Sequence, residues 1–413
     1  MSQAEKETIS VLRAAIGKKY VLTDQQSLEF YSMDVYRSFE IPIAVVQPGS
    51  VEELQEVVRV ATGLGMAIVA RGGGASYTDG YLPTTPKSIT IDTSRLNKIV
   101  EINEEDMFVT VESGVTWAEM AAALAEKNLR TPFWGPFSGL KATVGGSSSQ
   151  NSLSMGTSAY GGSPESILCY DIVLPSGEIL KTGSSSMENS SAFFRYYGPD
   201  LTGLFSGDSG ALGVKARITL RLIKLPTHTL TSSFGFKDYA SMSEGMAAAA
   251  REQSASSNWG LDPKLQQGQL GSTTLSDAIK AAFAVLKTAR NPFEAIIQLG
   301  KMALAGKRFL TGFDYSAHFV VEGYSIAEVK SKLAQTRRAV GPYGTEIANT
   351  IPTVLGAMPF MPLYPILGPQ GERWVPMHGF LSFSKMQVFH DRLMQLYEEN
   401  KEKMETHSVE AGA

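Results

Sequence analysis

The chain has 413 residues, of which 43% are hydrophobic and 19% are charged, and its formal net charge is -4. This length accommodates two or three domains, each with its own core. The mildly acidic balance gives no support to bulk nucleic-acid binding, and no run of 18 apolar residues predicts a membrane span. The opening stretch MSQAEKETIS lacks the apolar segment of a signal peptide, so we expect a cytoplasmic protein.

The single cysteine, Cys169, lies in the apolar run SILCYDIVLP. It can form no disulfide within the chain, which fits a reducing compartment, and we expect a buried and inert thiol. One cysteine also excludes a metal site built on paired cysteine ligands.

The beginning of the chain predicts a strand–helix–strand unit. A short helix is expected over 5–16, followed by a strand in IPIAVVQPGS. Ser50 and Glu53 form a capping-box pattern before a helix with one apolar face. The apolar stretch MAIVA (66–70) then predicts a second buried strand.

The next elements are mostly strands. KSITID, NKIVEIN and MFVTVESG predict three short strands, and Thr116 with Glu119 forms a second capping box before a helix. A glycine- and serine-rich stretch at 143–162 precedes the strand–turn–strand pattern SILCYDIVLPSGEIL. A further strand is expected over 214–224.

The second half of the chain has a different pattern. Alanine-rich helical stretches are expected at 241–253 and 275–306, and strands at 316–323 and 373–384. Ser384 is expected to cap a final helix.

Three consecutive glycines occur in RGGGASYTDGYLP, immediately after the strand over 66–70. Glycines let backbone N–H groups converge into a nest that holds an anion, and Arg71, Ser76 and Thr78 add charge and hydroxyl donors. The stretch matches neither the G-x-G-x-x-G dinucleotide motif nor the P-loop. Taken alone, it is equally the pattern of a tight turn.

Four stretches in this order resemble the family of flavoproteins related to vanillyl-alcohol oxidase and p-cresol methylhydroxylase. They are VVQPGSVEELQEVVRVATGLGMAIVARGGGASYTDG, ATVGGSSSQNS, AYGGSPESILCYDIVLPSGEIL and DLTGLFSGDSGALGVKARITLRL. The last is similar to the family pattern D-L-x-x-L-F-x-G-x-x-G-x-L-G-V-I-T. The resemblance runs from about residue 40 to 226 and implies FAD, with its pyrophosphate on the glycine loop.

The resemblance implies these cofactor-binding residues: Arg71, Gly72, Gly73, Gly74, Ala75, Ser76, Tyr77, Pro136, Thr143, Gly145, Gly146, Tyr160, Gly161, Gly210 and Val214. Many relatives attach FAD covalently to a His where this chain has Ala75, so we expect dissociable FAD. Two alternatives stay open: Gly213 is also typical of a strand entry, and Asp79 could neutralise Arg71 instead of touching cofactor.

The implied architecture is α+β. We expect a two-subdomain FAD-binding domain of the p-cresol methylhydroxylase type over 1–226, with its core at about 40–226. A substrate-binding cap over 227–413 would be built on an antiparallel sheet with flanking helices. In such an enzyme hydride passes from a substrate C–H to the flavin N5 atom, and the protein positions the substrate and removes a proton.

Few residues are available as the base. His318 and His378 lie in predicted strands of the cap, where a histidine is also commonly a hydrogen-bonded core residue. Arg373 lies near His378 and could hold an anionic group. The phenol branch of the family binds a phenolate with a Tyr/Tyr/Arg set, and the resemblance places Tyr77 or Tyr81 near the first tyrosine of that set. The remaining histidines, His228, His390 and His407, are expected at the surface.

The substrate class is the least determined feature. The 2-hydroxy-acid branch of the family carries a metal motif, G-H-x-G-D-G-N-x-H, that this sequence lacks, so no metal site is predicted. We therefore expect an alcohol, benzylic or alkylphenol substrate. A 2-hydroxy-acid dehydrogenase subunit and a non-catalytic flavoprotein subunit remain alternatives. Oxygen, a cytochrome, a quinone and another flavoprotein are all open as electron acceptor.

Two features suggest partners. The stretch 280–310 carries six basic residues and one acidic residue, a pattern that suits an acidic carrier protein or a membrane surface as well as a solvated helix pair. Family members normally continue past the last cap helix with a strand and a return segment. We therefore expect a hetero-oligomer in which a partner subunit supplies the remainder, or else a shortened form.

Overall fold

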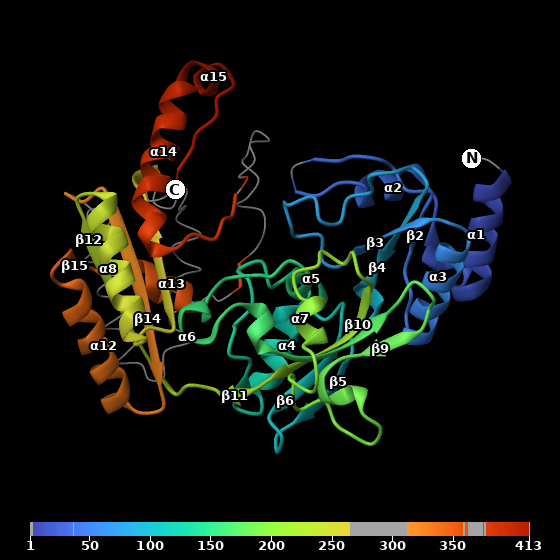
Figure 1. Cartoon of the computed structure of the whole chain (residues 1–413), viewed down its shortest axis with the longest axis horizontal. Helices are drawn as coiled ribbons and strands as arrows, with labels where there is room; N and C mark the ends of the chain where they lie inside the picture. Colours follow the sequence, from blue (N-terminus) through green and yellow to red (C-terminus); the bar gives the residue numbers. More distant parts are fainter. Residues whose placement is uncertain are drawn as a thin grey trace. The chain divides into compact units, whose positions relative to one another are not determined.

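Figure 1 shows a computed structural model of the chain. The structure describes residues 3–35, 37–264, 312–357, 360–361, 375 and 377–412. The chain divides into two compact units. The first comprises Met1–Gly156, Tyr160–Leu225 and Phe360–Met377, and the second comprises Thr157–Ala159, Pro226–Pro359 and His378–Ala413.

The first unit begins with a four-stranded sheet of order β1-β2-β4-β3. Its strands are β1 (Val21–Leu22), β2 (Ala44–Val46), β3 (Ala67–Arg71) and β4 (Ser88–Asp92), and its helices are α1 (Gln3–Ile16), α2 (Gln25–Tyr31) and α3 (Val51–Gly63). Strands β2, β4 and β3 are parallel, as the predicted strand–helix–strand unit requires, and β1 is antiparallel to β2. Helices α1 and α3 pack against each other and share an apolar core with the sheet (Figure 1).

The start of α3 follows the sequence prediction with one difference. The Ser50 side chain accepts the Glu53 N–H, so Ser50 is the N-cap as predicted. The Glu53 carboxylate, however, accepts the N–H of Gly49 at 2.6 Å. The helix is capped from both sides, but the second bond reaches one residue further back than in a standard capping box.

A five-stranded antiparallel sheet of order β5-β6-β10-β8-β9 forms the rest of the first unit. Its strands are β5 (Ile99–Asn103), β6 (Phe108–Glu112), β8 (Ile167–Val173), β9 (Ile179–Lys181) and β10 (Val214–Arg221). Three helices, α4 (Trp117–Ala125), α5 (Val144–Ser149) and α7 (Leu201–Leu204), and a small ladder of β7 (Leu129–Arg130) with β11 (Ile223–Lys224) accompany it. Of helix α6 (Thr157–Tyr160), only Tyr160 belongs to the first unit. Thr116 and Glu119 form the predicted capping box of α4. Cys169 is buried in β8, as predicted.

Side chains alternate across this sheet. Val109, Val111, Tyr170, Ile218 and Leu220 belong to a buried core with Trp117 and Met120 of α4. Thr110, Asp171, Arg217 and Thr219 lie on the opposite face and line a pocket there, which makes this part of that face polar. The register of β10 against β8 shifts between Lys215 and Arg217, so an extra residue enters β10 at that point.

The second unit contains an antiparallel sheet of order β13-β14-β12-β15. Its strands are β12 (His228–Phe236), β13 (Ser257–Leu261), β14 (Tyr315–Gly323) and β15 (Thr345–Ile347), and its helices include α8 (Tyr239–Glu252), α12 (Ile326–Val340) and α13 (Thr350–Ala357). Helices α8 and α12 pack together over the sheet through an apolar core around Phe234 and Phe319 (Figure 1). The predicted antiparallel sheet with flanking helices is confirmed. The predicted helix over 275–306 lies outside the described residues.

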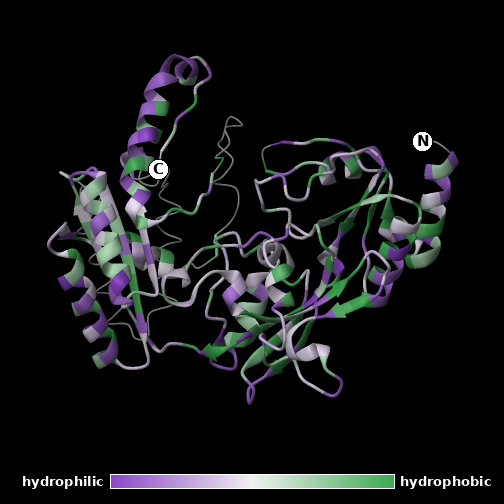
Figure 2. Ribbon diagram, viewed as in Figure 1, coloured by the Kyte–Doolittle hydropathy of each residue, from purple (hydrophilic) through white to green (hydrophobic). Residues whose placement is uncertain are grey.

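The chain then ends in α14 (Met386–Glu399) and α15 (Lys401–Thr406). Single-turn 3-10 helices occur at η1 (Lys18–Tyr20), η2 (Thr93–Arg95), η3 (Ser163–Ser166), η4 (Gly183–Ser186) and η6 (Phe383–Lys385). No residue of α14 is buried, and Figure 2 shows α15 and the last turn of α14 mostly in the hydrophilic colour. None of the described helices is long and apolar enough to cross a membrane.

Two predictions for this end are wrong. The predicted strand over 373–384 is absent from its described part, because 377–382 is irregular and 383–385 is a 3-10 turn. An alternation of apolar and polar residues does not by itself form a strand, because a strand needs a neighbouring strand with which to pair. Met377 and Phe380 of this stretch are exposed. Ser384 does not cap the last helix: the N-cap is Lys385, and the Ser384 hydroxyl lies 3.2 Å from that of Ser382.

Candidate cofactor site

Three glycine-containing segments converge within the first unit. They are the loop 71–80 after β3, the segment 141–152 that contains α5, and the segment 207–214 that leads into β10. The hydroxyl of Thr78 donates to Gln150 at 2.8 Å, which joins the first two segments. The sequence does not reveal this arrangement, because more than 50 residues separate each segment from the next.

Close packing explains the first two glycines of the loop. A β-carbon on Gly73 would overlap the carbonyl oxygen of Lys141, and one on Gly72 would overlap the hydroxyl of Thr143. Gly74 has a φ of +62°, where a side chain is strained. The glycine run therefore serves both as a turn and as the surface against which segment 141–146 packs.

The third segment runs along the end of α5. The N–H of Gly207 donates to the carbonyl of Ser148 at 2.9 Å, and that of Ser209 donates to Ser149 at 2.8 Å. Gly210 has a φ of +77°, and its open side faces Ala70 at the end of β3. Segment 207–210 therefore borders α5 and the end of β3, from which loop 71–80 departs.

The glycines of α5 have distinct roles. A β-carbon on Gly145 would lie 2.7 Å from Ser113, so this position has no room for a side chain. The N–H of Gly146 donates to the hydroxyl of Thr143, which is the N-cap of α5. Gly213 packs against Ile172 and immediately precedes the buried Val214 of β10, as the strand-entry interpretation requires.

Arg71 is the last residue of β3, where the loop begins. Its guanidinium is buried, donates to the carbonyl of Met33 at 2.7 Å and packs over the ring of Tyr81 at 4.8 Å. Asp79 does not neutralise it, contrary to the alternative considered from the sequence. Asp79 instead pairs with Arg37, whose Nε donates at 2.7 Å.

The remainder of the loop presents hydroxyl groups. The hydroxyls of Ser76 and Thr78 lie 2.9 Å apart, and Tyr81 donates to the carbonyl of Ser76 at 2.9 Å. Tyr77 is partly buried, and this burial raises the pKa of its phenol. Ala75 follows directly after the glycines.

The outlying predicted residues also lie in the first unit. The ring of Tyr160 is 5.8 Å from the guanidinium of Arg130, which packs more closely over Trp134 at 4.6 Å. Gly161 has a φ of +78°, and the carbonyl of Pro136 accepts the N–H of Gly139.

The chemistry of the site fits a large polar cofactor. Besides the hydroxyls of the loop, some buried polar atoms have no hydrogen-bond partner among the described residues. They include the Ser113 hydroxyl, which adjoins Gly145, and the Trp134 indole N–H. Buried donors and acceptors are normally paired, so such atoms are expected beside a ligand or ordered water.

The histidine candidates belong to the second unit. His318 is fully buried in β14, with its Nδ1 2.8 Å from the Ser233 hydroxyl and its Nε2 3.1 Å from that of Ser316. Burial lowers the pKa of His318 to about 3. This is the environment of a structural histidine. His378 is exposed in irregular chain, and Arg373 lies outside the described residues.

The expectation that His390 is a surface residue is wrong. Its side chain is 11% exposed and stacks on the ring of Tyr239 with centroids 3.9 Å apart. Its Nε2 lies 3.3 Å from the hydroxyl of Tyr315. The sequence places these rings far apart, and only the packing of α14 on α8 brings them together.

Sequence reasoning missed a buried ion pair in the third segment. Lys215 donates to Asp208 at 2.6 Å, and the two side chains are only 3% and 2% exposed. A Lys that enters an apolar strand seven residues after an Asp is the signal that was available in the sequence.

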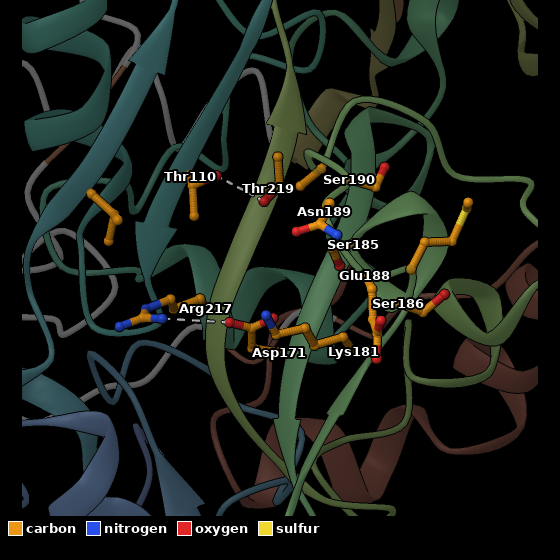
Figure 3. A pocket seen from close by; sticks show the side chains of 13 residues that line it. Thr110, Asp171, Lys181, Ser185, Ser186, Glu188, Asn189, Ser190, Arg217 and Thr219 are labelled. Carbon is orange, nitrogen blue, oxygen red and sulfur yellow. Dashed lines mark hydrogen bonds and ion pairs between the residues drawn. The ribbon is translucent and has the colours of Figure 1, made fainter.

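A separate pocket of about 450 Å³ opens on the polar face of the five-stranded sheet (Figure 3). Arg217 and Asp171 lie in it on neighbouring strands, with 3.6 Å between their charged atoms. Thr110 and Thr219 also line it and are hydrogen-bonded to each other. This pocket therefore lies on the face opposite the apolar core that contains Tyr170 and Ile218.

Comparison with known proteins supports the cofactor assignment. Residues 42–183 match the family model described as an FAD binding domain. The mitochondrial D-lactate dehydrogenase [cytochrome] of Arabidopsis thaliana is 30% identical over 237 residues, which cover 57% of this chain and 40% of the relative. The chain thus matches less than half the length of that relative.

Solved structures show the same fold. An alkyldihydroxyacetonephosphate synthase superposes with a TM-score of 0.65 at 16% identity, over 86% of this chain and 63% of the other. Substrate-bound p-cresol methylhydroxylase superposes with a TM-score of 0.64 at 20% identity, over 84% and 66%. By sequence, residues 42–183 match an FAD binding domain, and by fold the chain is similar to p-cresol methylhydroxylase.

Proposed function

We propose that the chain is an FAD-dependent oxidoreductase, an oxidase or dehydrogenase that removes hydride from an alcohol or from the benzylic carbon of an alkylphenol. The observation that carries the proposal is the convergence of the three glycine-containing segments in the domain whose family binds FAD. When bound, FAD supplies the hydride acceptor. The protein must then hold the substrate and accept its proton.

The residues of the first unit have distinct roles in this proposal. Backbone N–H groups of loop 72–78 would hold the pyrophosphate, with hydroxyl donors from Ser76 and Thr78. Gly145 and Gly210 would allow the backbone to approach the rest of the cofactor. Ala75 cannot form a covalent link to flavin, so the proposed attachment at this loop is non-covalent.

The second unit would supply the cap. We assign the FAD-binding domain to 1–226 and the cap to 227–413, and the division of the chain at Leu225 and Pro226 supports this boundary. His378 is the proposed proton acceptor, because its side chain is exposed and an imidazole can accept a proton. His318 is not proposed, because both of its nitrogens face hydroxyl groups in the core. Arg373 is a proposed anion-binding partner from the sequence alone.

A second substrate class also has support. The D-lactate dehydrogenase relative matches by sequence, whereas the likeness to p-cresol methylhydroxylase is one of fold. A 2-hydroxy acid is therefore the second candidate substrate.

Anaerobic reduction of the reconstituted protein distinguishes the two classes. The purified chain is loaded with FAD, freed of excess cofactor by gel filtration and mixed with benzylic alcohols and alkylphenols, or with D-lactate and glycolate, while the flavin absorbance is followed. Bleaching by the first group supports the leading proposal, and bleaching by the second supports the alternative. A chain that does not retain FAD would contradict both. Retained FAD that no substrate of either group reduces would contradict an oxidoreductase acting on these classes.

A further inference from the structure

The buried pair Asp208–Lys215 joins the third segment to the start of β10. Asp208 belongs to the segment whose neighbouring N–H groups, those of Gly207 and Ser209, bond to α5. Gly210, two residues on, faces Ala70 at the end of β3. The pair is therefore in the wall of the candidate cofactor site and not in a distant part of the core.

The bulge in β10 determines which face of the sheet Lys215 occupies. Lys215 is opposite Ile172 in the ladder, and its ammonium group lies 5.5 Å from the ring of Tyr170. Both neighbours belong to the face covered by α5, whereas Arg217 points into the polar pocket on the other face. Bulges commonly redirect a side chain in this way beside a functional site.

One oxygen of Asp208 has no partner. Oδ1 accepts the ammonium of Lys215 at 2.6 Å and the N–H of Gly210 at 2.9 Å. Oδ2 is buried and has no hydrogen-bond partner among the described residues. An unpaired buried carboxylate oxygen is costly, so a donor is expected to occupy this position in the working protein.

An isolated lysine at the buried position 215 would be strongly destabilising, and burial lowers the pKa of Lys215 even though Asp208 opposes that shift. Apolar side chains of similar volume are often as stabilising as a buried ion pair, or more so. Stability alone therefore does not account for this buried pair.

We infer that Asp208, held in place by Lys215 and the Gly210 N–H, accepts a hydrogen bond through Oδ2 from a hydroxyl or ring N–H donor of bound FAD. This inference rests on the proposed function. It makes Asp208 a cofactor-contacting residue and Lys215 a positioning residue that also balances its charge.

A double variant separates this role from a purely structural one. Removing one charge alone leaves the other buried and should destabilise the apoprotein in either case. Asp208→Asn combined with Lys215→Met removes both charges at nearly constant volume, so the apoprotein should unfold close to the temperature of the unmodified chain. Its FAD should nevertheless bind about tenfold more weakly or worse, because an amide donor replaces the acceptor oxygen.

The matched control is Asp171→Asn with Arg217→Met. It removes an ion pair from the other face of the same two strands, β8 and β10 (Figure 3), and should leave FAD affinity unchanged. Affinity is measured by quenching of flavin fluorescence on titration into apoprotein, and stability by thermal unfolding of the same samples.

The outcomes are distinct. Weaker FAD binding in the Asp208/Lys215 double variant, with intact apoprotein stability and an unaffected control, supports the inference. Unchanged FAD affinity in that variant would overturn it and leave the proposed function standing, since Oδ2 would then face water. Failure of the unmodified chain to bind FAD would overturn both.

Discussion

The carbonyl oxygen of Lys141 occupies the space that a β-carbon on Gly73 would need. Because the obstacle is backbone, the only way to accommodate even a methyl group is to move loop 71–80 away from segment 141–146. The binding of a ligand between these two segments therefore depends on this contact.

Gly73→Ala is therefore expected to abolish FAD retention. The measurement is the ratio of flavin to protein absorbance after gel filtration. Gly63→Ala is the matched control, since a β-carbon at Gly63 meets nothing within 4 Å. That control should keep its flavin and gain about 0.5 to 1 kcal/mol of stability. Full flavin content in the Gly73 variant would contradict the assignment of the loop.

Arg71→Lys should destabilise the first unit. The guanidinium donates to the carbonyls of Tyr31 and Met33 and packs over aromatic rings, and an ammonium group cannot reproduce this planar arrangement. We expect a loss of about 2 kcal/mol in the free energy of unfolding, measured with urea. Arg37→Lys alters a partly exposed pair with Asp79 and should change stability by less than about 1 kcal/mol. Equal losses in the two variants would show that burial of Arg71 contributes nothing.

His318 should make the protein sensitive to acid. Its pKa is about 3 in the folded chain and about 6.5 when unfolded, so between these values the unfolded state binds the additional proton. The contribution of His318 to the free energy of unfolding is complete above pH 6.5. It is lost at about 1.4 kcal/mol per pH unit as the pH falls toward 3. Urea unfolding at pH 7 and pH 4.5 measures this loss. His318→Gln should show a smaller loss, and identical losses in both proteins would contradict the burial of a neutral imidazole.

His378→Ala should slow the anaerobic reduction of bound flavin without loss of FAD. Loss of a proton acceptor typically reduces the rate by about 10² to 10⁴-fold, which stopped-flow absorbance resolves. His407→Ala, which alters an exposed histidine after α15, is the control and should be neutral. A normal reduction rate in the His378 variant would remove this residue from the proposed machinery.

Local patterns predicted the elements of the first half well. The strand–helix–strand unit, the N-caps at Ser50 and Thr116 and the buried strand around Cys169 all rest on residues within a few positions of one another. Interactions between residues so close in the chain can be predicted from the sequence alone. The strand expected around His378 failed for the converse reason: a strand forms only where another strand is available to pair with it.

The sequence by itself indicated the FAD domain, because the four stretches that resemble the flavoprotein family are local properties of the chain. Only the tertiary structure decided why those glycines are needed, which face of β10 carries Lys215, and that His318 and His390 are packed against neighbours. Each of these depends on contacts between residues distant in the chain. A position requires glycine only where another segment packs closely against it. A charge requires a partner only where such packing has buried it.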